Sequence, residues 1–99
     1  MRIVFMGSSD FSVASLAALV GAGETVATVI TQPDRPAGRG LKVTASPVKQ
    51  FAAERGLPVF QYASMKSDDA YAELGALQPD LLVVAAYGQI LPQRILDVP

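Results

Sequence analysis

A basic segment directly behind an apolar run holds the side chains best suited to binding chemistry in this sequence. It includes TQPDRPAGRG, residues 31–40, and the stretch from Pro33 to Gln50 has four basic residues and one acid, a net charge of +3 against −4 for the remainder. Its basic residues are Arg35, Arg39, Lys42 and Lys49. Cationic groups on an acidic body attract phosphate-bearing partners. The prolines and glycines predict neither helix nor sheet here, and charge alone favours a solvated loop over a phosphate-binding arm.

A second candidate is the turn Gly7-Ser8-Ser9-Asp10, which follows a predicted strand at Arg2–Met6. In α/β folds such a turn faces a helix N-terminus, where backbone N–H groups bind phosphates and other anions. The segment has only the first glycine of G-x-G-x-x-G and no Walker A lysine, so a nicotinamide-cofactor or nucleoside triphosphatase site is disfavoured. A tight turn with a helix cap and a contact to a small ligand or substrate remain equally good interpretations.

A third candidate is the stretch Tyr87-Gly88-Gln89-Ile90-Leu91, which follows a continuously apolar run. We expect it at the carboxyl edge of the sheet, where ligands dock. Gly88 permits a close backbone approach, and the amide of Gln89 both donates and accepts hydrogen bonds. A flat heterocycle fits such a turn, with Ile90 and Leu91 as apolar walls. A plain strand-to-helix turn with two core residues explains the same spacing equally well.

The residue types present disfavour several other kinds of site. The sequence has no cysteine, histidine or asparagine, so a thiol nucleophile, a thiolate metal site and the commonest general base are absent. Asp68 and Asp69 suit the first turn of a helix and Asp80 a loop, so together with Asp34 they do not predict a metal site. No apolar run has membrane-spanning length and no signal peptide precedes the first strand, so we expect a cytoplasmic protein.

Apolar periodicity predicts four strands that alternate with helices. The expected strands cover 2–6, 25–30, 58–60 and 81–86, and helices are expected to begin near Ser8–Asp10, Ser46-Pro47, Ser67 and Gln93. This alternation predicts an α/β fold with a Rossmann-like, doubly wound parallel sheet. The expected inward faces include Phe11 and Leu16 in the first helix and Tyr71, Leu74 and Leu77 in the third.

The last predicted strand raises a question about the extent of the fold. The run Leu81–Ala86 is continuously apolar, as in a strand covered on both faces. Placed beside the first strand, it would form an exposed apolar edge, which natural proteins avoid. We therefore expect residues 1–99 to be the N-terminal part of a longer protein.

Five stretches occur together in one order: RIVFMGSSDF, TQPDRPAGRG, SPVKQFA, ERGLPVFQ and QPDLLVVAAYGQILP. In that order they closely resemble the N-terminal segment of the methionyl-tRNA formyltransferase family, essentially from Arg2 to Pro99. Each motif alone is weak, whereas the ordered set is highly specific. Ser8-Ser9 stands where the family usually has Thr-Pro, a change that should keep the turn but loosen it.

The resemblance implies a formyltransferase-type fold that is incomplete in this chain, with residues 1–99 as the N-terminal part of the catalytic domain. The rest of that domain and any C-terminal domain would be absent. The implied activity is transfer of a formyl group from 10-formyltetrahydrofolate to the methionyl amino group of initiator methionyl-tRNA, in translation initiation. The implied partner is that tRNA, without DNA, membrane or metal, and the full-length protein would be a monomer.

The same resemblance implies roles for the three candidate segments. The loop with Arg35, Arg39 and Lys42 would reach the tRNA acceptor stem, and Arg39 matches an important loop arginine of the family. A guanidinium fork suits phosphate contacts, and proline limits the entropy lost on binding. The turn 7–10 would lie near the end of the bound aminoacyl-tRNA, and residues 87–91 would line the folate pteridine pocket.

The resemblance assigns no catalytic residue to this chain. The family's catalytic asparagine, histidine and aspartate lie beyond the equivalent of Pro99, so the 99 residues alone should be inactive. Two other classes stay open: a noncatalytic α/β binding module, and a folate-dependent formyltransferase for another acceptor, such as a glycinamide ribonucleotide or a sugar nucleotide. The arginine loop argues against the latter, because a small acceptor gives no reason for a long basic projection.

Overall fold

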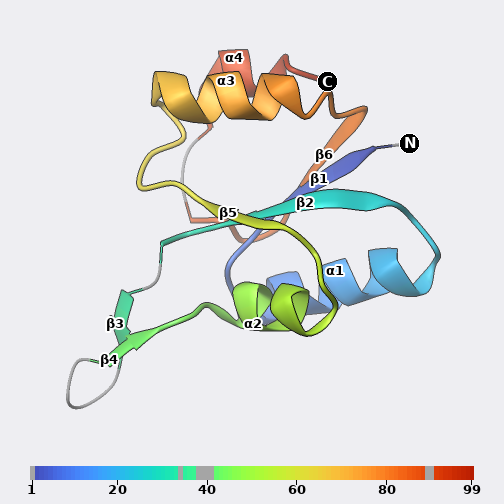
Figure 1. Cartoon of the computed structure of the whole chain (residues 1–99), viewed down its shortest axis with the longest axis vertical. Helices are drawn as coiled ribbons and strands as arrows, with labels where there is room; N and C mark the ends of the chain where they lie inside the picture. The colour runs from blue at the N-terminus through green and yellow to red at the C-terminus, as the bar shows by residue number, and fades with distance from the viewer. Residues whose placement is uncertain (1, 34, 38–41, 89–90) are drawn as a thin grey trace.

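The computed structural model describes residues 2–33, 35–37, 42–88 and 91–99, and shows a parallel sheet between two layers of helices (Figure 1). The sheet consists of β1 (Ile3–Met6), β2 (Val26–Thr31), β5 (Val59–Gln61) and β6 (Leu81–Val84). The helices are α1 (Asp10–Gly21), α2 (Pro47–Glu54), α3 (Asp68–Ala76) and α4 (Gln93–Leu96). Two further strands, β3 (Arg35–Ala37) and β4 (Lys42–Thr44), form a separate sheet.

The predicted helix starts are confirmed, and short side-chain oxygens cap those of α1, α2 and α3. Ser9, Ser46 and Ser67 each accept a hydrogen bond from a backbone N–H in the first turn of α1, α2 and α3 respectively, which satisfies a donor that the helix leaves unpaired. Pro47 follows its cap at the first helical position, where its missing N–H costs nothing. Local chemistry therefore sets where these helices begin.

The sheet separates two apolar cores. Its strand order is β5-β2-β1-β6, and every pairing is parallel. Side chains alternate across the central strand β1, so Phe5 packs with α1 and α2 while Val4 and Met6 pack with α3 and α4. The doubly wound α/β prediction is confirmed, and Figure 1 shows α3 and α4 on one face with α1 and α2 on the other.

One expectation about the basic segment is wrong. Residues 35–37 and 42–44 pair as an antiparallel hairpin, with Pro36 opposite Val43. Proline is tolerated in such a ribbon because one side of each strand has no partner strand that needs its N–H. In Figure 1 the hairpin projects away from the four-stranded sheet. The prediction for Arg39 falls outside the described residues.

Two residues expected on inward faces are exposed. Phe11 is 84% exposed, and Tyr71 is 41% exposed and lies under the guanidinium of Arg94, 4.7 Å from the ring centroid. Leu16 and Leu74 are buried as expected, and α1 also buries Ser12, which was not expected. Helical spacing thus located both helices but was wrong about part of each buried face.

The last strand lies at an edge of the sheet. β6 pairs with β1, and within the described residues its other side has no strand. Leu81 and Val84 are 42% and 45% exposed. The described part of the chain therefore leaves these two apolar side chains uncovered. The conditional prediction of an exposed apolar edge beside the first strand is confirmed.

Candidate functional site

The loops after β1, β2 and β6 meet at one edge of the sheet, which we call the carboxyl edge. The chain passes from β1 outward to β2 and β5, then returns to place β6 on the other side of β1. The point where the winding reverses is the usual ligand crevice of an open α/β sheet. Here that point lies between Gly7, after β1, and Ala85, after β6.

Gly7 is tightly packed at this point. A Cβ at this position would lie 2.6 Å from the Ala85 carbonyl oxygen and 2.7 Å from Cβ of Ser12, distances that no side chain tolerates. The Gly7 N–H donates to the Ile30 carbonyl at 3.0 Å, and the Ser8 N–H reaches the Ala86 carbonyl at 3.4 Å. The turn after β1 is thus held between the ends of both neighbouring strands.

Ser12 joins the start of α1 to the loop after β6. Its backbone N–H donates to the Ser9 hydroxyl at 3.3 Å, and its own hydroxyl accepts from the Ser9 N–H at 3.2 Å, which completes a reciprocal capping box. The Ser12 hydroxyl also donates to the Ala85 carbonyl and is fully buried. Asp10 is exposed at the first position of α1. The predicted turn 7–10 therefore forms part of a cross-braced site rather than a loose loop.

Gln32 directly follows β2 and connects three loops of the carboxyl edge. Its backbone N–H donates to the Ser8 hydroxyl at 2.9 Å, and its side-chain amide donates to the Tyr87 carbonyl at 3.1 Å. Its own carbonyl accepts from the Gln61 amide at 3.1 Å. The sequence interpretation missed Gln32. A polar residue at the carboxyl end of a buried parallel strand is the signal that would have found it.

The third candidate segment presents backbone rather than side chain to this edge. The Tyr87 side chain is only 2% exposed, and its hydroxyl has no hydrogen-bond partner among the described residues. Burial raises the pKa of Tyr87 to about 12. Ala86 and Gly88 take positive φ values of 50° and 94°, and Leu91 packs against the α3–α4 core. The predictions for Gln89 and Ile90 fall outside the described residues.

The hairpin places two of the predicted basic positions on paired strands. Arg35 begins β3 opposite Thr44, and Lys42 begins β4 opposite Ala37. The main sheet and this hairpin are separate sheets (Figure 1). The residues predicted to contact tRNA therefore do not form one cluster. The turn 7–10 lies at the carboxyl edge, whereas Arg35 and Lys42 lie on the hairpin.

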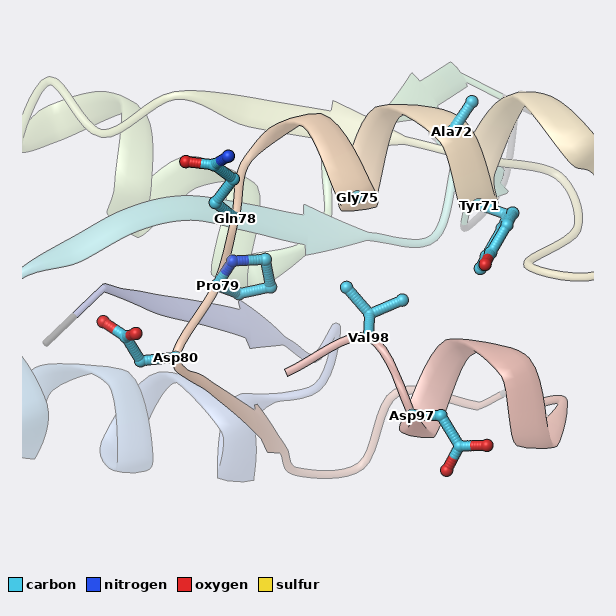
Figure 2. Close-up of a pocket in the computed structure, with 8 residues that line it drawn as sticks. All are labelled: Tyr71, Ala72, Gly75, Gln78, Pro79, Asp80, Asp97 and Val98. Atoms are coloured by element: carbon cyan, nitrogen blue, oxygen red, sulfur yellow. The ribbon is translucent and has the colours of Figure 1, made fainter.

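A hollow of about 600 Å³ lies at the opposite edge of the sheet (Figure 2). Its walls come from α3, the turn before β6 and the residues after α4. Asp80, in that turn, accepts a hydrogen bond from the Arg2 backbone N–H at 2.6 Å. Because ligands of α/β sheets dock at carboxyl ends of strands, this hollow is not the candidate site.

Two other kinds of feature are absent from the described ranges. They contain no group of three or more His, Cys, Asp and Glu side chains placed to hold a metal ion. None of their helices has the length and apolar character needed to cross a membrane.

Comparisons with known proteins give the chain its family. The formyl transferase family matches residues 1–99. Methionyl-tRNA formyltransferases from Methylococcus capsulatus, Ectopseudomonas mendocina and Marinobacter nauticus are 58%, 57% and 54% identical over 99 residues. These matches cover 100% of this chain and 32% of each relative, so the chain spans about a third of their length. The resemblance read from the ordered motifs is confirmed, and the chain belongs to the formyl transferase family.

Proposed function

We propose that this chain forms part of an enzyme that transfers a formyl group from 10-formyltetrahydrofolate to the methionyl amino group of initiator methionyl-tRNA. The observation that carries the proposal is the identity of 54% to 58% along all 99 residues with curated methionyl-tRNA formyltransferases. The matched region includes the projecting basic segment as well as the sheet.

The proposal divides binding between two regions. Arg35, Arg39 and Lys42 on the hairpin segment would contact phosphates of the tRNA acceptor stem, because guanidinium and ammonium groups suit phosphate oxygens. The turn 7–10 would lie near the methionyl end of the tRNA. Its position at the carboxyl edge supports this role, since the N-terminus of α1 there favours negative charge and polar ligands.

The folate donor would bind beside residues 87–91. The backbone is what this segment offers to a ligand: Gly88 lies exposed in a left-handed conformation at the carboxyl edge, whereas the Tyr87 side chain is buried in the core. Tyr87 would thus contribute through its main chain, and Leu91 through an apolar wall. The donor supplies the formyl group, and this chain's residues would hold and orient it.

Catalysis would require groups that the chain lacks. Stabilising a tetrahedral oxyanion and moving a proton from the attacking amine need donors and a base within hydrogen-bond reach, and the sequence has neither histidine nor asparagine. We therefore propose that residues 1–99 are the N-terminal part of a catalytic domain and are inactive alone. The complete protein would be a cytoplasmic monomer that binds neither DNA nor membrane and requires no metal.

The test is a hybrid enzyme, in which these 99 residues replace the matching segment of the Methylococcus capsulatus formyltransferase. We expect the hybrid to formylate initiator methionyl-tRNA, with kcat/KM within roughly tenfold of the parent enzyme, a loss of about 1.4 kcal/mol or less in transition-state stabilisation. A folded hybrid without transfer activity would contradict the proposal and favour a noncatalytic binding module. Activity of the isolated 99 residues would contradict the inactivity proposed for them.

A further inference from the structure

Gln32 occupies a position between the two regions that the proposed function assigns to different substrates. It is the first residue after β2, and β3 begins three residues later at Arg35. Pro33 follows it and restricts Gln32 to extended backbone. The direction in which the chain leaves the sheet toward the hairpin is therefore set at this residue.

The side chain of Gln32 reaches sideways to the other region. Its amide donates to the Tyr87 carbonyl at 3.1 Å, across a sequence separation of 55 residues. A Cβ on Gly88 would lie 3.1 Å from the same amide nitrogen. The glycine thus makes room for the Gln32 amide, in addition to any room it leaves for a ligand.

The chain that follows the hairpin is also linked to Gln32 by hydrogen bonds. After β4 the chain enters α2, where Lys49 donates from Nζ to the Gln61 side-chain oxygen at 3.2 Å. The Gln61 amide in turn donates to the Gln32 carbonyl at 3.1 Å. The helix that follows the hairpin is consequently linked to Gln32 through one intermediate side chain, while Gln32 itself lies just before the hairpin.

We infer that Gln32 is a positioning residue that couples the base of the β3–β4 hairpin to the Tyr87–Gly88 turn. The inference rests on the proposed function, because Gln32 would hold the hairpin proposed to bind tRNA in a fixed position relative to the Tyr87–Gly88 turn proposed to bind the folate donor. Three groups of Gln32 make contacts with three other segments: the N–H donates to Ser8, the carbonyl accepts from Gln61 at the end of β5, and the side-chain amide donates to Tyr87. The side-chain amide is the part that sequence can change.

The decisive variant is Gln32→Met in the hybrid enzyme. Methionine keeps an unbranched side chain of similar length but cannot donate, so the backbone links to Ser8 and Gln61 remain while the link to Tyr87 is lost. Gln78→Met is the matched control, because Gln78 is exposed in the turn before β6 at the opposite edge. Neither substitution changes charge.

Hydrogen exchange tests the coupling without any need for activity. In Gln32→Met we expect peptides covering β3, β4 and the Tyr87–Gly88 turn to exchange about fivefold faster or more, as for the loss of one hydrogen bond. Peptides from α3 should exchange as in the parent hybrid, and Gln78→Met should change neither hairpin nor turn. Unchanged exchange at both the hairpin and the turn in Gln32→Met would overturn the inference, whether or not the hybrid is active.

Kinetics then separate positioning from general destabilisation. In an active hybrid, Gln32→Met should raise KM for both tRNA and the folate donor. Arg39→Ala should lower kcat/KM for initiator methionyl-tRNA about tenfold in the parent hybrid, but only about twofold in a hybrid that already carries Gln32→Met. Full additivity of the two substitutions would contradict coupling. An inactive parent hybrid would contradict the proposed function but not the role of Gln32. The exchange experiment would still decide that role.

Discussion

The carboxyl edge and the β3–β4 hairpin adjoin each other in the chain, yet they are built in different ways. The edge is held by close contacts between distant segments: Gly7 lies against Ala85, and the Ser12 hydroxyl donates to the same carbonyl. The hairpin is a two-stranded ribbon, and among the described residues its strands pair only with each other. A crevice that must fit one small ligand gains from such rigidity, whereas an arm that meets a charged surface needs reach and positive charge.

The difference predicts that substitutions that disturb the packed contacts of the edge cost stability, and that substitutions in the hairpin segment cost binding of an anionic partner. Substitutions in the hybrid enzyme defined above test this division. Those at the edge are ordered from the largest expected effect on folding to the smallest, and the arm itself is tested last.

Gly7→Ala should be the most destabilising change at the edge. The new methyl group would lie 2.6 Å from the Ala85 carbonyl oxygen and 2.7 Å from Ser12 Cβ, so backbone must move, at a cost of about 2–3 kcal/mol in the free energy of unfolding. Urea unfolding measures this loss. Gly21→Ala is the control: its new methyl group meets nothing within 4 Å, so it should leave stability unchanged or raise it. Equal effects of the two substitutions would show that the surroundings of Gly7 are not tightly packed.

Ser12→Ala should cost about 1–2 kcal/mol, because it removes half of a capping box and leaves the Ala85 carbonyl without this donor. Ser15→Ala, half-buried on the same helix, gains helix propensity and should change stability by no more than about 0.5 kcal/mol. The comparison again uses urea unfolding. Similar small effects at both serines would mean that the α1–β6 brace contributes nothing to folding.

Tyr87→Phe should leave stability unchanged or raise it by up to about 1 kcal/mol at neutral pH, because the removed hydroxyl is buried and unpaired among the described residues. Burial raises its pKa from 10.0 to about 12, so the folded state favours the protonated phenol. Stability should be fully present below pH 10 and fall as pH rises toward 12.

Chemical unfolding at several alkaline pH values checks this prediction. The decline should be shallower in Tyr87→Phe than in the hybrid with tyrosine at this position. A marked loss of stability at neutral pH would show instead that the hydroxyl has a partner in the complete protein.

The local features of the fold were predictable, while the contacts that make the site were not. Ser46-Pro47 indicates a helix start, and the β-branched run before Gln32 indicates a strand, because each signal lies within a few neighbouring residues. The Gln32–Tyr87 and Ser12–Ala85 hydrogen bonds join residues 55 and 73 positions apart. No local pattern contains such pairs, so the network of the carboxyl edge appears only once the sheet order is known.

The hairpin shows a different limit of prediction from the sequence. Judged residue by residue, its prolines and glycines excluded a sheet, yet Pro36 pairs opposite Val43, because an isolated ribbon leaves room for a residue that cannot donate. The exposure of Phe11 and Tyr71 likewise depends on the fold rather than on the local sequence. Apolar spacing gives the period of a helix, but which part of an apolar stripe is covered depends on the neighbours that the fold supplies.

Arg39→Ala tests the division between arm and edge most directly. With steady-state kinetics of the hybrid at several salt concentrations, we expect KM for initiator methionyl-tRNA to rise about tenfold, as for one lost charged contact. The salt slope of log kcat/KM should fall by about 1. KM for 10-formyltetrahydrofolate should stay within about twofold, and Lys66→Ala, which removes an exposed charge elsewhere, should change neither constant appreciably. Equal catalytic efficiency on initiator tRNA for Arg39→Ala and the parent hybrid would contradict the account.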